Sequence, residues 1–361
     1  MRYVPRNCIR EGSLLARPVY GENGKVLLRE GVKMSKTYIK RLAFYGIPGA
    51  FIEDTISLDL EIKSAVTEKV KASALRQLTT AFKNANDATS HEKADVNAKA
   101  LLETAEQIVE NIISHKDVML NLFDIKTYDN YTFFHCLNVA ILSIAIGVAL
   151  DYTQKDMVKL AFSALLHDIG KVFIDSKIIN KKGRLNPEEM LKVFCHPKEG
   201  YDYVRKHFYS TISSVTARGI LDHHERIDGS GYPNHLIGDK ISTFGKIIAV
   251  ADVYDALVSD RPYRQAVFPS EAIEYIMGSC GTFFDIKIVE AFKQKIVPFP
   301  VGTSVALSDG TVALVMENFE GYSQRPTVKV FMKNNEWIDP YILNLKEESF
   351  NITVVSATVE A

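Results

Sequence analysis

The alternation of apolar and polar positions changes character several times along the chain. From residue 1 to about residue 57, short apolar runs separated by turn residues predict β-strands. "LLARPVYGENGKVLLREGVKM" contains two such runs around a turn with Gly21, Asn23 and Gly24, and "IPGAFIED" predicts one more strand. This first segment is therefore expected to be a small β-rich module.

Helical periodicity begins at about residue 58. Between 58 and 115, apolar residues recur every three or four positions, with a polar break at "NANDATSHEKADVNA". This pattern predicts a helical connector, built either as part of a bundle or as a signalling stalk. From 116 to 297 helical patterns dominate, for example in "FPSEAIEYIMGSC" and "FDIKIVEAFKQKI". We expect this stretch to form one helical domain.

Pro298 and Pro300 mark the next boundary. Beyond them, apolar and polar residues alternate on both sides of Asp309-Gly310, a strong signal for a β-hairpin. "TVKVFM" and "NITVVSATV" predict further strands, so residues 298–361 form a second β-rich module. The expected fold class is mainly α, with a helical domain flanked by small N-terminal and C-terminal β-rich modules.

One apolar segment approaches the length of a membrane span. "FFHCLNVAILSIAIGVAL" runs for 18 residues from Phe133 to Leu150. It contains His135 and Asn138, and polar groups are costly inside lipid. These residues favour a buried core helix, and no membrane span is expected.

Composition and charge exclude some classes of partner. Apolar residues make up 47% of the chain, and the net charge of −1 provides no basic field for a nucleic-acid polymer. The four cysteines are scattered and form no CxxC pair, which argues against a zinc ribbon or a disulfide framework. "MRYVPRNCIREGS" has no apolar core of a signal peptide, so a cytoplasmic location is expected.

Candidate chemistry is concentrated in a group of histidines. Five of the nine histidines lie in or beside apolar runs: His135, His167, His196, His223 and His224. Asp168 stands next to one of them, and Asp252 lies in the apolar stretch "IIAVADVYDAL". One such histidine is usually a satisfied core residue, but seven unpaired buried polar groups would be expensive. A shared metal site would satisfy them together.

The residue types indicate the class of metal. Imidazole and carboxylate without thiolate suit iron, manganese, zinc or nickel. The adjacent pairs His167-Asp168 and His223-His224 suit a two-metal centre, because a carboxylate can bridge two ions. Such a centre clamps a phosphorus for in-line attack and makes hydroxide available at neutral pH.

Three ordered motifs then make the assignment specific. "HDIGK" at 167–171, "HHERIDGSGYP" at 223–233, and "ADVYDAL" followed by "RPYR" at 261–264 resemble the HD-GYP family. These are HD-superfamily phosphodiesterases that hydrolyse cyclic di-GMP in bacteria. The resemblance covers roughly residues 120 to 295, and the "DGxGYP" segment distinguishes it from the wider superfamily.

The resemblance implies a role for each matching residue. One metal would be held by His135, His167, Asp168 and Asp252, and Asp168 would bridge to a second metal held by His196, His223 and His224. Asp168 and Lys171 would be the catalytic residues, with Lys171 near the scissile phosphate. The implied substrate-binding residues are Gly231, Tyr232, Pro233, Asp255, Arg261 and Arg264. Their plainer alternatives are a surface turn for "DGSGYP", a solvated helix edge for the arginines and helix capping for Lys171.

Two departures from the family pattern refine the expectation. Cys136 follows His135 where serine is common, with little consequence expected. Tyr131 stands where some members carry an acidic ligand of a third metal, which favours a binuclear centre. Two divalent ions, iron or manganese, are expected, and two-metal members of the family tend to stop at linear pGpG rather than continue to GMP.

Two other functions remain open from the sequence. One is hydrolysis of another cyclic dinucleotide or nucleotide, and the other is sensing of cyclic di-GMP without turnover. The N-terminal β module fits a regulatory input or a homodimer contact, and a packing role without a ligand fits it at least as well, whereas the C-terminal β module gives no indication of chemistry.

Overall fold

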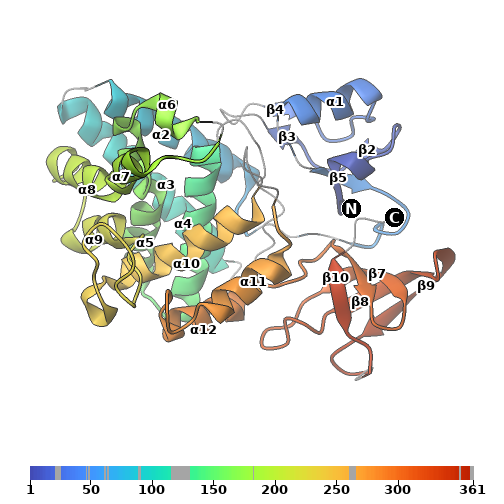
Figure 1. Cartoon of the computed structure of the whole chain (residues 1–361). Helices are drawn as coiled ribbons and strands as arrows, with labels where there is room; N and C mark the ends of the chain where they lie inside the picture. The colour runs from blue at the N-terminus through green and yellow to red at the C-terminus, as the bar shows by residue number, and fades with distance from the viewer. Residues whose placement is uncertain are drawn as a thin grey trace.

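The computed structural model divides into a helical domain and a body of β-sheets (Figure 1). It describes residues 1–20, 26–45, 47, 49–60, 62, 65–87, 91–114, 131–181, 183–259, 266–348 and 351–357. The helical domain is formed by the middle of the chain, whereas the β-sheets come from its two outer parts. The predicted turn at Gly21, Asn23 and Gly24 lies outside the described residues.

The helical domain confirms the mainly α fold class. Side chains at several helix starts accept hydrogen bonds from backbone N–H groups of the first turn. The hydroxyl of Thr153 accepts from the N–H of Asp156 at 3.2 Å, and the hydroxyl of Ser242 accepts from the N–H of Gly245 at 3.2 Å. The elements are α2 (Glu68–Asn86), α3 (His91–Ser114), α4 (Tyr131–Ala149), α5 (Gln154–Leu166), η3 (Ile169–Phe173), α6 (Ser176–Ile179), α7 (Pro187–Phe194), α8 (His196–His207), α9 (Ser214–Asp222), η4 (Gly238–Lys240), α10 (Thr243–Val258), α11 (Pro269–Gly278) and α12 (Ile286–Lys295).

Helix α4 lies in the core of this domain. Its segment Thr132–Ala149 is long and apolar enough to span a membrane, but 78% of it is buried inside the protein. It packs against α5, α10 and α12, as expected for a core helix. The helices predicted as a connector belong to the same core, because Leu78 of α2 and Ile108 of α3 are fully buried in its cluster. A free stalk is therefore wrong, and the bundle alternative is correct.

The N-terminal module combines short strands with one helix. Its elements are β1 (Arg2–Pro5), η1 (Arg6–Cys8), β2 (Leu14–Leu15), β3 (Val19–Tyr20), β4 (Val26–Leu28), α1 (Lys36–Phe44) and β5 (Gly49–Glu53). The strands form a sheet in the order β1-β5-β2 and a separate β3-β4 pair. The strand expected in "IPGAFIED" is β5, whereas α1 was not expected from the sequence.

The C-terminal module is an antiparallel sheet with the order β10-β6-β7-β8-β9. Its strands are β6 (Ser304–Leu307), β7 (Thr311–Glu317), β8 (Thr327–Lys333), β9 (Glu336–Asn344) and β10 (Val354–Ala357). The predicted hairpin joins β6 to β7, with Gly310 at a φ of 80° in the turn. Strand β9 was missed because it is mostly exposed and lacks an alternating burial pattern.

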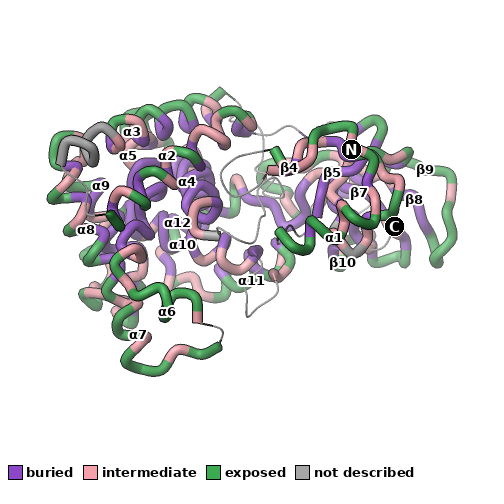
Figure 2. The backbone as a smooth tube through the Cα atoms, turned by 90° about the horizontal axis from the view of Figure 1, so that it is seen from above, coloured by how far each residue is buried: buried purple, intermediate pink, exposed green. Residues whose placement is uncertain are grey.

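The two β modules pack against each other and form one unit, called the β body below. Phe51 and Ile56 from the N-terminal module share an apolar cluster with Leu314 and Phe331 from the C-terminal sheet. Arg2 also donates to the hydroxyl of Ser304 at 3.3 Å. Both views show this body beside the helical domain (Figures 1 and 2). The domain boundaries at 57, 115 and 297 stay predictions.

Candidate metal centre

Five segments of the helical domain bring the predicted ligands together. His135 and Asp252 project from the interiors of α4 and α10, so their backbones are fixed by helical hydrogen bonds. The other ligands stand at helix ends: His167 and Asp168 between α5 and η3, His196 at the start of α8, and His223 and His224 after α9. Helix ends that lie close together thus supply five of the seven ligands.

Three of the imidazoles are oriented in the same way. The Nδ1 atoms of His167, His196 and His223 each lie 2.7 Å from the backbone carbonyl three residues earlier. A carbonyl only accepts, so each Nδ1 carries the proton and donates it. The opposite nitrogen, Nε2, is then left with a lone pair that points into the cluster.

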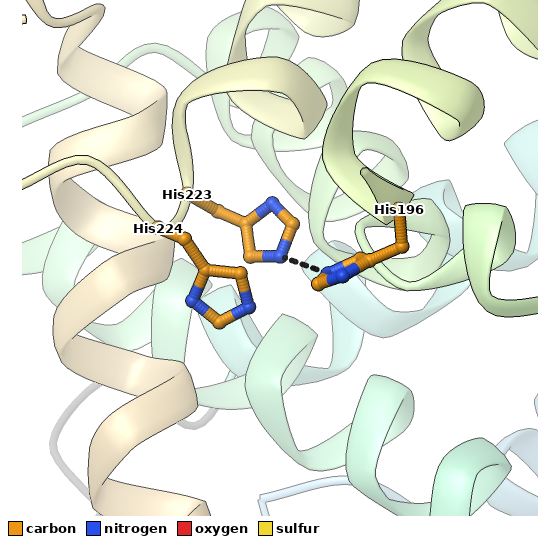
Figure 3. Close-up of side chains that lie close together, drawn as sticks. All are labelled: His196, His223 and His224. Atoms are coloured by element: carbon orange, nitrogen blue, oxygen red, sulfur yellow. Dashed lines mark hydrogen bonds between the residues drawn. The ribbon is translucent and has the colours of Figure 1, made fainter. Parts of the chain in front are cut away.

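These lone pairs meet without a proton between them. The Nε2 atoms of His196 and His223 lie 3.2 Å apart (Figure 3). The Nε2 of His167 and the Oδ1 of Asp168 are buried and make no hydrogen bond within the described chain. Facing acceptors of this kind repel one another unless a cation lies between them. The arrangement therefore fits a metal ion.

Asp168 stands between two groups of ligand atoms. Its Oδ1 lies 3.3 Å from Nε2 of His196, and its Oδ2 lies 3.5 Å from Nε2 of His167 and 3.8 Å from Nε2 of His135. The carboxylate thus turns one oxygen toward each group. This placement is what a bridging ligand requires.

The ligand atoms form two main sets. His196, His223 and His224 bring their ligand atoms within 4.8 Å of one another, and so do His135, His167 and Asp252. Cys136 also lies near His167 and Asp168, but burial raises the pKa of its thiol well above the ordinary value. A neutral thiol is a poor ligand. The donors that fit are imidazole and carboxylate, as iron and manganese accept.

The protonation states suit metal binding. Burial lowers the pKa of His224 to about 3 and that of His223 well below its ordinary value, so both rings are neutral at pH 7. Burial raises the pKa of Asp168, but opposing interactions, of which the charge of Lys171 is the largest, outweigh burial and hold the pKa well below the usual range. His223 and His224 are thus neutral and Asp168 is ionised, which are the forms that bind metals.

His135 is held by carboxylates on both nitrogens. Its Nε2 lies 3.0 Å from Asp252, and its Nδ1 donates to Asp255 at 2.7 Å. Burial lowers the pKa of His135, but the hydrogen bonds to Asp252 and Asp255 raise it to about 9. Without a metal this ring is therefore protonated at pH 7, and an ion bound at Nε2 would replace the proton there while Nδ1 keeps its bond to a carboxylate, as is usual for a metal-ligating histidine.

Asp255 is hydrogen-bonded to His135. It lies one helical turn after Asp252 as predicted, but its carboxylate is 2% exposed and accepts hydrogen bonds from His135 and from Asn138 Nδ2 at 2.7 Å. Both oxygens are turned into the protein. The geometry favours orientation of His135 over contact with a substrate.

Lys171 lies at the edge of the cluster. Its Nζ is 2.6 Å from Oδ2 of Asp168, and its side chain is 30% exposed. The ammonium therefore reaches both the buried carboxylate and the surrounding solvent. This position is compatible with contact to an anionic substrate.

The loop with Gly231, Tyr232 and Pro233 folds back onto the two adjacent histidines. A Cβ atom on Gly231 would lie 2.3 Å from the backbone nitrogen of Arg226, so only glycine fits. The backbone N–H of Tyr232 donates to the carbonyl of His224 at 3.1 Å. Gly231 thus serves close packing of the loop on its own chain, where the sequence had indicated close approach to a ligand.

Glu225 is a support of this loop that the sequence analysis missed. Its carboxylate is 3% exposed and accepts the backbone N–H groups of Asn234 at 2.7 Å and Leu236 at 2.9 Å. It ties the far end of the loop to the residue after His224. A signal was available, since an acidic residue directly follows the His223-His224 pair. Asn138 and Phe194 were also missed, and Arg261 and Arg264 lie outside the described residues.

Comparisons with known proteins are consistent with this geometry. The model of the HD domain family matches residues 92–288, more than half of the chain. The chain is 35% identical over 226 residues to the cyclic di-GMP phosphodiesterase PA4108 of Pseudomonas aeruginosa, covering 63% of this chain and 54% of that protein. It is 34% identical over 171 residues to the 3'3'-cGAMP-specific phosphodiesterase 3 of Vibrio cholerae, covering 47% and 36%.

A solved structure supports the fold. Bd1817, a HDG"Y"P protein from Bdellovibrio bacteriovorus, superposes with a TM-score of 0.53 at 20% identity. The match covers 80% of this chain and 97% of that one. It therefore extends beyond the helical domain. The chain spans about half the length of PA4108 and about a third of the Vibrio enzyme.

Proposed function

Because the chain belongs to the HD domain family, we propose that it is a metal-dependent phosphodiesterase that hydrolyses cyclic di-GMP to linear pGpG. The observation that carries the proposal is the pair of ligand sets on either side of Asp168, with the Nε2 atoms of His196 and His223 3.2 Å apart. Each set would hold one ion, and Asp168 would complete both sets. Iron or manganese suits these donors.

The ions, when bound, would activate water and neutralise the charge of the phosphate. In the overall reaction, the oxygen of water forms a bond to phosphorus, and the bond from phosphorus to the ribose 3′ oxygen breaks. The leaving oxygen takes a proton. The chain's own residues would prepare this step by fixing both sets of ligands before substrate arrives.

Lys171 would take part directly. Its Nζ lies beside Asp168 at the exposed edge of the cluster. From there an ammonium stabilises negative charge that grows on a phosphate oxygen. Arg261 and Arg264 would bind the dinucleotide, as the sequence predicts. A cytoplasmic location and a homodimer contact stay predictions.

Another cyclic dinucleotide is the second candidate substrate. The observation in its favour is the similarity to a 3'3'-cGAMP-specific phosphodiesterase. Both substrates carry the same phosphodiester backbone, so the metal centre alone does not distinguish them. Discrimination would depend on the groups that contact the bases.

One set of assays tests the proposal. The protein is purified anaerobically, its metal content is measured, and the Mn²⁺-loaded and Fe²⁺-loaded forms are incubated with cyclic di-GMP, 3'3'-cGAMP and cyclic di-AMP. Chromatography resolves pGpG from GMP. We expect pGpG from cyclic di-GMP and no product after chelation. Full turnover by metal-free protein would contradict the mechanism, and tight binding without product would identify a sensor.

A further inference from the structure

Three aromatic rings from separate elements stack beside the metal ligands. The rings of Phe194 and Tyr232 are 4.2 Å apart and 23° from parallel, and those of Tyr232 and His224 are 4.7 Å apart and 32° from parallel. We propose that Tyr232 is a positioning residue that holds the imidazole of His224, with Phe194 as the backing ring. This proposal rests on the metal centre of the proposed function.

Two rings pack against the tyrosine separately. Phe194 and His224 each lie at stacking distance from Tyr232, and among the described residues they make no ring contact with each other. Each therefore covers its own part of the tyrosine ring, which reduces the surface on which a base of the substrate could stack.

His224 needs such support more than its neighbours do. The Nδ1 atoms of His167, His196 and His223 each donate to a backbone carbonyl, which fixes the plane of the ring. His224 makes no corresponding hydrogen bond in the described structure, and its Nδ1 lies 3.7 Å from the nearest oxygen of Asp252. Stacking on Tyr232 replaces the missing hydrogen bond as the constraint on this ring.

The backbone of the loop fixes Tyr232 from the other side. Its N–H donates to the carbonyl of His224, and Gly231 packs against the backbone of Glu225 and Arg226. The backbone that carries the tyrosine ring is therefore tied to the backbone of the histidine on which the ring packs. Tyr232 and His224 form one structural unit.

Phe194 connects this unit to helix α7. The helix contains no buried residue and stands out from the helical domain with α6 (Figure 2). Phe194 is its last residue, followed by Cys195 and then by the ligand His196. The same turn thus supplies the backing ring and a ligand of the same metal set.

The proposal makes the ring of Tyr232 necessary and its hydroxyl dispensable. Tyr232→Phe keeps the stack, whereas Tyr232→Ala and Phe194→Ala each remove one ring from it. Loss of an outer contact of a metal ligand lowers affinity by about tenfold or more.

The test is titration with Mn²⁺ alone, followed by the electron paramagnetic resonance signal of the free ion. We expect Tyr232→Phe to bind Mn²⁺ like the wild type, and Tyr232→Ala and Phe194→Ala each to weaken one of two sites by about tenfold. The double variant should lose less than the product of the two effects, because both act on one stack. Tyr203→Ala, which removes a tyrosine stacked on His207 at 4.7 Å, is the matched control and should leave Mn²⁺ binding unchanged.

Two outcomes would overturn the proposal. One is unchanged Mn²⁺ affinity in Tyr232→Ala. The other is a raised KM for cyclic di-GMP in Tyr232→Phe with normal Mn²⁺ binding, which would make the hydroxyl a substrate contact. If Tyr232→Ala does not fold, Phe194→Ala and Tyr232→Phe still decide. Because Mn²⁺ binding needs no substrate, the inference can hold even if the proposed reaction fails.

Discussion

The ligand cluster of the helical domain and the ion pairs of the β body arrange their polar groups in opposite ways. In the β body, charges meet opposite charges: Arg2 pairs with Asp54, and Lys329 pairs with Asp59 at 2.9 Å. In the ligand cluster, acceptors face acceptors, as His196 and His223 do at 3.2 Å. Stable proteins normally satisfy buried polar groups. Nε2 of His167 and Oδ1 of Asp168 make no hydrogen bond within the described chain, and a metal ion would satisfy both.

The substitution with the largest expected effect is Asp168→Asn, which removes the carboxylate between the two ligand sets. We expect hydrolysis of cyclic di-GMP to fall by about 10³-fold or more, because several kcal/mol of charge stabilisation is lost. Chromatography and metal analysis of the same samples measure the effect. Asp239→Asn changes a fully exposed carboxylate and should leave both unchanged. Near-normal turnover by Asp168→Asn would remove Asp168 from the mechanism.

The β body should be separable from this chemistry. Phe331 is fully buried between the two β modules, so Phe331→Ala should lower the free energy of unfolding of the β body by about 3–5 kcal/mol. Hydrogen exchange should report the loss in β7 and β8. Mn²⁺ binding by the helical domain should remain normal. A loss of Mn²⁺ binding equal to the loss of β structure would show that the two regions fold as one unit.

Within the helical domain, an orienting carboxylate should matter less than a ligand. Asp255→Asn weakens the hydrogen bond to His135 Nδ1, and we expect the affinity for Mn²⁺ to fall by about 10–100-fold. Titration with Mn²⁺, with the free ion followed by electron paramagnetic resonance, measures this affinity. Asp285→Asn is the control, since that residue pairs with Lys246 at 2.9 Å outside the metal set. Equal effects of the two substitutions would mean that Asp255 has only a structural role.

The smallest effect is expected at Asp54 in the β body. Burial raises its pKa, but hydrogen bonds from Ser57 and Arg2 outweigh burial and hold the pKa below the usual 3.8. Its stabilisation is therefore complete above pH 3.8 and is lost as the pH falls through the lowered pKa.

Asp54→Asn should therefore lower the free energy of unfolding of the β body by about 1 kcal/mol at pH 7. Below the lowered pKa of Asp54 it should have no effect. Thermal unfolding followed at both pH values checks this. A cost that stays the same in acid would show that the ion pair with Arg2 contributes no stability of its own.

The sequence predicted local features better than distant contacts. The Asp309-Gly310 hairpin and the core helix α4 were predictable because turn chemistry and periodicity act over a few residues. The packing of the two β modules against each other was not predictable, because Phe51 and Phe331, which share one apolar cluster, are separated in the sequence by the whole helical domain. Nothing in the local pattern of either segment specifies the other.

The candidate site shows the same limit. The residue types of the ligand cluster follow from the sequence, and the structure brings all seven together. The contacts behind the ligands do not follow from it. The bond from Asp255 to His135 and the ring of Phe194 against Tyr232 are visible only in the structure, because the residues of each pair lie far apart in the sequence.

The shared apolar cluster of the β body also sets an order of events during synthesis. Phe51 leaves the ribosome before the helical domain is made, but Leu314 and Phe331 emerge only after it. At ordinary translation rates this delay is on the order of tens of seconds. The N-terminal strands therefore have an apolar face uncovered while the helical domain folds. A nascent chain stalled before residue 314 would be the species most exposed to chaperones and proteases.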